Sequence, residues 1–154
     1  MPTFSLDTSC LIAAVCGWHE RHAAAAAEVG ARLDRGERMT VAAHALVEAY
    51  AVLTRLPAPH RLSTADAWTL LRTNFVEAAA VTEISGRQQI NLLQRLAASG
   101  IGGGRSYDAL IAAAARHGGA DALLTFNPRD FERLPQTPPI FEPPDPAPSS
   151  NRRT

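Results

Sequence analysis

The sequence predicts a single α/β domain in which a central, mostly parallel sheet of four to five strands is flanked by helices on both faces. Short apolar segments with strand character alternate along the chain with longer segments of helical periodicity. Parallel strands need long crossover connections, which these helices supply. The length of 154 residues suits one domain, and a content of 46% hydrophobic and 19% charged residues is ordinary for a globular chain.

The N-terminal half is predicted to contain two strands and three helical segments. Each strand is a short apolar run, and the helices begin after capping residues or end at glycine or proline. In chain order these elements are a strand over residues 3–6 that ends at Asp7, a helical turn over 11–15, an alanine-rich helix over 19–35 closed by Gly36, a strand over 38–42 and a helix over 44–56 stopped by Pro57.

The C-terminal half continues the alternation. Serines 63, 85 and 106 are the predicted N-caps of three helices, because a serine hydroxyl accepts hydrogen bonds from the first free amides of a helix. The elements in order are a helix carrying Ala67, Leu70, Leu71 and Phe75, a strand over 79–83, a helix from Ser85 to Gly100 with Ile90, Leu93 and Leu96 on one face, a helix over 106–117 and strands over 122–125 and 139–141.

The last segment, PPDPAPSSNRRT, is rich in proline and serine. Such a composition cannot bury enough apolar surface to fold. We therefore predict a domain over residues 1–142 and an unstructured tail over residues 143–154.

Charge and cysteine content limit the classes of function. The 15 basic and 15 acidic residues give a net charge of zero, so contact with nucleic acid must be local or supplied partly by a metal ion. Cys10 and Cys16 form no CxxC motif, and we expect both to be reduced thiols. The chain shows no signal peptide and no apolar run long enough to span a membrane, so we expect a cytoplasmic protein.

Five polar residues are predicted to gather at one edge of the sheet. Asp7 follows the first strand, and Asn127 and Asp130 follow the strand over 122–125. In an open parallel sheet, ligands bind beyond the carboxyl ends of the strands. Asp108 lies in the first turn of its helix, and Glu48 lies at the margin of the apolar stripe of another helix.

Each acid has a simple structural explanation. Asp7 can cap the following helix, Asp108 is favoured by the helix dipole, and Glu48 can pair with an arginine. Several carboxylates at one edge repel one another, however, unless a cation neutralises them. Hard oxygen ligands suit Mg²⁺ or Mn²⁺, and such a site suits metal-assisted hydrolysis of phosphodiesters.

Four segments resemble a known family. They are FSLDTSCLIA around Asp7, VAAHALVEAYAVLTRL around Glu48, SYDALIAAAA around Asp108 and ALLTFNPRDFERL near the C-terminus. Over residues 3–141 the chain resembles the PIN-domain ribonucleases, in particular the VapC toxins of bacterial toxin–antitoxin pairs. The resemblance implies a single-stranded or structured RNA substrate, one or two Mg²⁺ or Mn²⁺ ions, a homodimer, and a VapB-type antitoxin whose tail covers the active site.

The resemblance also assigns residues to roles. It gives Asp7, Glu48 and Asp108 the three acidic positions of the family. The expected reaction is hydrolysis of an RNA phosphodiester by a metal-bound water, with Asp7 and Asp108 as direct ligands and Glu48 as a ligand through water or as a general base. Many members have an aspartate where this chain has Asn127, so either Asn127 or Asp130 fills the fourth position.

Neighbouring side chains have expected supporting roles. Thr125 should hydrogen-bond the carboxylate cluster, and Thr8 or Ser9 should orient Asp7. Arg105 and Arg129 flank the acidic residues and either hold phosphates or remain solvated. Apolar residues of the middle helices, namely Trp68, Leu71 and Phe75, suggest a patch for dimerisation.

Two other functions remain open from the sequence. One is a phosphoryl-transfer enzyme that forms an aspartyl phosphate at Asp7. The haloacid-dehalogenase pattern would place a second aspartate two residues later, where this chain has Ser9. The other is a non-catalytic module that binds RNA or protein, which Asn127 leaves possible although three acids are present.

Overall fold

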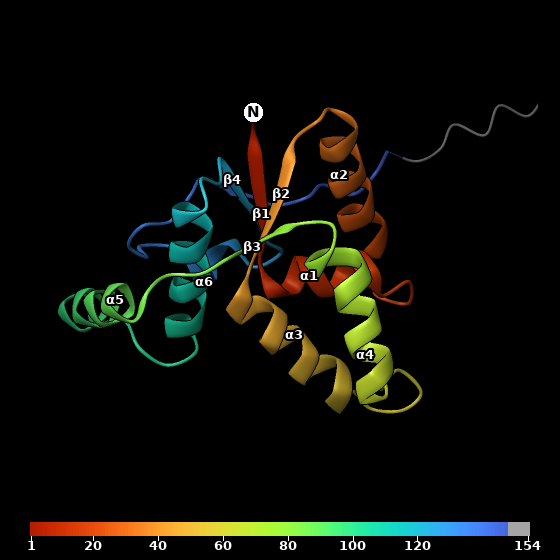
Figure 1. The fold of residues 1–154 in the computed structure, drawn as a ribbon, viewed down its shortest axis with the longest axis horizontal. Coiled ribbons are helices and arrows are strands. Elements are labelled where there is room, and N and C mark those ends of the chain that lie inside the picture. The colour runs from red at the N-terminus through yellow and green to blue at the C-terminus, as the bar shows by residue number, and fades with distance from the viewer. Residues whose placement is uncertain (148–154) are drawn as a thin grey trace, which may run out of the picture.

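The computed structural model describes residues 1–147, and these form a five-stranded sheet (Figure 1). The strand order is β3-β2-β1-β4-β5, and each neighbouring pair is parallel. The strands are β1 (Thr3–Leu6), β2 (Arg38–Ala42), β3 (Ala80–Thr82), β4 (Ala122–Leu124) and β5 (Ile140–Phe141). The predicted fold class is therefore confirmed.

Six α-helices in this described part of the chain connect and cover the strands. Figure 1 shows the sheet between α5 and α6 on one side and α1 to α4 on the other. The helices are α1 (Thr8–Val15), α2 (His22–Asp34), α3 (Ala43–Arg55), α4 (Thr64–Leu71), α5 (Gly86–Ala98) and α6 (Arg105–His117). A π-helical turn over Arg72–Val76 (η1) follows α4, and a 3₁₀ turn over Pro128–Phe131 (η2) follows β4.

The central strand explains the layered packing. All four residues of β1 are buried, as expected for a strand covered by helices on both faces. Phe4 and Leu6 pack with Val41 of β2 and with Leu123 and Leu124 of β4, each fully buried. This core fixes the strand order, and with it the positions of the residues that follow each strand.

The carboxyl ends of β1 and β4 lie side by side. Leu6 pairs with Leu124, and the backbone N–H of Asp7 donates to the Leu124 carbonyl at 3.0 Å. The chain enters α1 directly after Asp7 and enters η2 shortly after Thr125. Two segments far apart in sequence therefore meet at the edge where ligands bind in such sheets.

Two of the three predicted serine caps are confirmed. The Ser63 hydroxyl accepts from the Asp66 N–H, and Ser85 forms a capping box with Gln88. The prediction for Ser106 is wrong, because α6 begins at Arg105 and its N-cap is Gly104. The Ser106 N–H instead donates to the Gly103 carbonyl, so a turn of the glycine-rich loop leads directly into α6.

Two predictions of apolar faces need correction. On α5, Ile90 and Leu93 are exposed, and the buried face is formed by Leu92 and Leu96. In the predicted dimerisation patch, Leu71 and Phe75 belong to the hydrophobic core, while Trp68 is exposed. Both errors have the same cause, since apolar residues at helical spacing occur on two sides of these helices and periodicity alone does not say which side faces the sheet.

The predicted boundary between domain and tail remains a prediction, because residues 148–154 lie outside the described part. The side chain of Pro143 is fully buried, and the Arg21 guanidinium donates to its carbonyl at 3.3 Å. Packing therefore continues at least to Pro143. No helix within residues 1–147 is both long and apolar enough to cross a membrane.

Candidate active site

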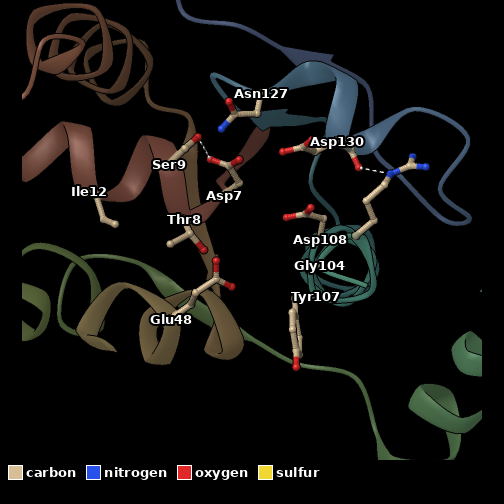
Figure 2. Close-up of a pocket in the computed structure, with 11 residues that line it drawn as sticks. Asp7, Thr8, Ser9, Ile12, Glu48, Gly104, Tyr107, Asp108, Asn127 and Asp130 are labelled. Atoms are coloured by element: carbon tan, nitrogen blue, oxygen red, sulfur yellow. Dashed lines mark hydrogen bonds between the residues drawn. The ribbon is translucent and has the colours of Figure 1, made fainter. Parts of the chain in front are cut away.

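A cavity of about 530 Å³ opens at the carboxyl end of the sheet (Figure 2). All five residues predicted from the sequence line it, and they come from four separate elements: Asp7 before α1, Glu48 in α3, Asp108 in the first turn of α6, and Asn127 and Asp130 at η2. The expected convergence is thus what the fold produces.

Asp7 is the most firmly held of these side chains. It is 4% exposed and caps α1, with Oδ1 accepting from the Cys10 N–H at 2.9 Å. The same oxygen accepts from the Ser9 hydroxyl at 2.7 Å, and Oδ2 accepts from the Thr125 hydroxyl at 2.5 Å. Ser9 and Thr125 therefore orient Asp7 as predicted. This carboxylate therefore both caps α1 and lines the cavity.

Burial raises the pKa of Asp7, and the negative charge of Glu48 adds to that rise. The hydrogen bonds from Cys10, Thr125 and Ser9 lower the pKa and so favour the ionised form. An ionised carboxylate in this position would be stabilised further by a cation in the cavity, because the charge is otherwise poorly solvated.

Asp108 faces the same cavity from α6. Its pKa is raised to about 7, chiefly by burial and then by the charges of Asp130, Asp7 and Glu48, while Arg105 acts to lower it. The Asp108 carboxyl is thus half-buried and surrounded by like charges. At neutral pH a cation would be needed to keep all of the acids ionised together.

We predict that Asp108→Asn makes the metal-free protein more stable at high pH. An aspartate in the unfolded chain titrates near ~4, so a folded pKa of about 7 means that the stability present below ~4 is lost as pH rises through about 7. The amide removes that loss. In EDTA, the melting temperatures of parent and variant should diverge from pH 5 to pH 8, with the variant higher.

Asp7→Asn is not expected to give this gain. Asparagine replaces one acceptor oxygen with an NH₂ group, which cannot accept from Thr125, Ser9 or Cys10. If Asp108→Asn melted at the parent temperature at pH 8, the pKa of Asp108 would not be raised in the folded protein.

Glu48 and Thr8 present unpartnered oxygens beside the acids. Within residues 1–147, Glu48 Oε2 and Thr8 Oγ1 are buried without a hydrogen-bond partner, although His44 Nε2 lies 3.4 Å from Glu48 Oε2. Figure 2 shows both side chains lining the same side of the cavity. Buried oxygens without partners are costly, so this side of the cavity fits an ion or an ordered water. Thr8 thus does not orient Asp7.

The donor set fits a hard divalent cation. Carboxylates of Asp7, Glu48, Asp108 and Asp130 and the amide of Asn127 surround one cavity. Among residues 1–147, no three His, Cys, Asp or Glu side chains are grouped tightly enough to enclose a metal by themselves. A divalent cation that keeps several waters and binds through one or two carboxylates does not need such an enclosure.

Both candidates for the fourth position, Asn127 and Asp130, line the cavity. The Asn127 N–H donates to the Thr125 hydroxyl at 2.9 Å, which fixes the backbone of the loop. The charge of Asp130 is, after burial, the first cause of the raised pKa of Asp108. Of the two candidates, Asp130 is therefore the one whose charge acts on the other acids of the cavity.

The two arginines differ. Arg105 lines the cavity, and its guanidinium donates to the carbonyls of Asp130 and Glu132, so it fastens η2 to α6. Arg129 does not line this cavity. Tyr107 also lines the cavity and directly precedes Asp108, but it was not predicted from the sequence. The only signal for it in the sequence is an aromatic residue beside a candidate ligand.

Several carboxylates around one cavity are suitable ligands for divalent cations, and such cations assist the hydrolysis of phosphate esters. A family model described as PIN domain matches residues 5–136 of this chain. The chain therefore belongs to the PIN-domain family.

Individual relatives agree with this assignment. Ribonuclease VapC40 of Mycobacterium tuberculosis is 37% identical over 131 residues, which cover 83% of this chain and 91% of that protein. Ribonuclease VapC27 of the same species is 41% identical over 117 residues, which cover 75% and 80%. The solved structure of DNA-bound VapBC from Salmonella typhimurium has a TM-score of 0.66 at 23% identity, covering 92% of this chain and 98% of that one.

Proposed function

We propose that this protein is a metal-dependent endoribonuclease that acts as the toxin of a VapBC-type toxin–antitoxin pair. The observation that carries the proposal is the meeting of Asp7, Glu48, Asp108 and Asp130 in one half-buried cavity. Family membership and the ribonuclease relatives favour this reading over an aspartyl phosphate at Asp7 and over a non-catalytic module. Both oxygens of Asp7 also accept hydrogen bonds, which suits a fixed ligand better than a nucleophile.

The chemistry follows from what each side chain can do. Asp7 and Asp108 would hold Mg²⁺ or Mn²⁺, which when bound supplies positive charge for the phosphate oxygens and activates a water. Hydrogen bonds hold Asp7 in one orientation, so it costs little to organise for the reaction. The unpartnered Oε2 of Glu48 is an open acceptor for a proton from the attacking water.

The proposed partner is a VapB-type antitoxin whose tail covers the acidic cavity. Support comes from the VapC relatives, and the fold neighbour from Salmonella typhimurium is itself a VapBC complex. An RNA substrate and such a partner imply action in the cytoplasm. We further propose a homodimer, for which Trp68 and Val47 offer exposed apolar area around a hollow of about 230 Å³.

A cleavage assay tests the proposed activity. The purified protein is incubated with an end-labelled RNA that has both single-stranded and hairpin regions, in Mg²⁺, in Mn²⁺ and in EDTA. We expect internal cleavage in the presence of either ion and intact RNA in EDTA. Cleavage that persists in EDTA, or RNA left intact under all three conditions, would contradict the proposal.

The fourth position is tested by calorimetric titration of Mn²⁺. Because affinity for hard cations rises with the charge of the ligands, Asn127→Asp should tighten binding if this position contacts the ion. If Asp130 already supplies that charge, Asp130→Ala should weaken binding, while Asn127→Asp leaves it unchanged or weaker. The electrostatic position of Asp130 leads us to expect this second pattern. Unchanged binding in both variants would place the fourth ligand elsewhere.

A further inference from the structure

We propose that Tyr107, stacked on His44, and the small cavity beside it form a binding site for an unpaired nucleobase next to the acidic cavity. The proposal deepens the proposed function and rests on it, because it assigns a place to the nucleotide that neighbours the cleaved phosphate. The ligand is a base of single-stranded RNA.

The two rings form a stable platform. The ring centroids of His44 and Tyr107 lie 5.2 Å apart with an angle of 10° between the planes, which is an offset stack. His44 comes from α3 and Tyr107 from α6, so the stack joins the two helices that carry Glu48 and Asp108. A ring held in place in this way loses little conformational freedom when a ligand binds.

The platform borders two cavities. Tyr107 lines the acidic cavity and also a second cavity of about 140 Å³. Figure 2 shows Tyr107 beside Asp108 on α6, with its ring pointing away from the carboxylates. The second cavity is lined by leucines of α5 and α6 and by two polar side chains, Gln89 and Ser106. An apolar space with a few polar groups matches a flat, hydrogen-bonding heterocycle.

Tyr107 is 57% exposed, although it adjoins the half-buried Asp108. An aromatic ring that is open to solvent at the rim of a phosphate-cleaving cavity has the chemistry of the platforms on which proteins stack unpaired RNA bases.

The charge of the protein favours such a contact. The net charge is zero, and Arg105, which lines the acidic cavity, is engaged with the backbone of η2. Phosphate contacts can therefore supply only part of the affinity for RNA. Stacking is independent of net charge and contributes roughly 1–3 kcal/mol per base.

Binding is measured by fluorescence anisotropy with an Asp108→Asn background, so that the RNA stays intact. The probes are a labelled short oligoadenylate and a labelled abasic ribose-phosphate chain of the same length. The variants added to this background are Tyr107→Leu, Tyr107→Phe and the control Trp18→Leu, which removes another exposed aromatic side chain that stacks on a histidine, His60, and lines neither cavity.

We expect Tyr107→Leu to weaken binding of oligoadenylate by about 5- to 10-fold, the lower end of the range for stacked bases, and to leave binding of the abasic chain unchanged. Tyr107→Phe and Trp18→Leu should bind both probes as the background protein does. Equal weakening for both probes, unchanged affinity for oligoadenylate, or equal affinity of the background protein for the two probes would overturn the proposal.

Three further measurements separate this proposal from others. A change in molar mass by light scattering for Tyr107→Leu, with unchanged affinity for RNA, would make the ring a protein contact and overturn the base site. If the parent fails to cleave RNA while base-dependent binding is found, the proposed nuclease activity fails and the base site stands. Parent-like KM for Tyr107→Leu in an active enzyme would refute the base site alone.

Discussion

Replacement of Asp108 by asparagine is expected to reduce RNA cleavage by roughly 1,000-fold or more, since it removes the charge of a proposed metal ligand, worth several kcal/mol in the transition state. The side chain lies in the first turn of α6 and faces Asp130, Asp7 and Glu48. Asparagine keeps the shape and loses the charge. The rate is measured on the labelled RNA in Mg²⁺ and in Mn²⁺.

The matched control for this experiment is Asp66→Asn. Asp66 also lies in the first turn of a helix, α4, and is exposed away from the acidic cavity. Circular dichroism should show both variants folded. Parent-like cleavage by Asp108→Asn, still abolished by EDTA, would mean that the metal is bound elsewhere in the protein.

Thr125→Val should lower activity by about 10- to 100-fold, the usual range for a residue that orients a metal ligand. The Thr125 side chain is fully buried, donates to Asp7 Oδ2 and accepts from the Asn127 N–H. Valine has nearly the same shape but offers neither bond. Leaving buried groups unpaired should also lower the free energy of unfolding by about 1–3 kcal/mol.

Thr40→Val controls for the loss of stability. Thr40 is equally buried, and its hydroxyl donates to the Phe4 carbonyl within the sheet, away from the acidic cavity. We expect this variant to lose stability and keep its activity. If the two variants lost activity in equal measure, the role of Thr125 would be general packing and not the orientation of Asp7.

The strands and the convergence of the acids were predictable from local sequence. The run TFSL before Asp7 and the run ALL before Thr125 are short, apolar and fully or largely buried, and parallel pairing brings their ends together. The orientation of Asp7 was predictable in part, because Ser9 and Thr125 are polar residues adjacent to these strand ends.

Other features depend on tertiary contacts that local patterns do not encode. The apolar residues of α5 occur on two sides, and only its packing against α6 decides that Leu92 is buried and Leu93 exposed. The stack of His44 on Tyr107 joins residues of different helices, so neither residue alone predicts it. The use of Arg105 to hold η2 likewise depends on where the chain returns after β4.

The central claim is that Asp7, Glu48 and Asp108 hold the divalent cation on which RNA cleavage depends. Anomalous diffraction from a crystal grown with Mn²⁺ tests this most directly, because the anomalous signal locates the ion itself. We predict a peak in the cavity between Asp7 and Asp108, on the side that Glu48 faces. An anomalous peak at another site, with none in this cavity, in crystals of a protein that cleaves RNA in Mn²⁺ would contradict the account.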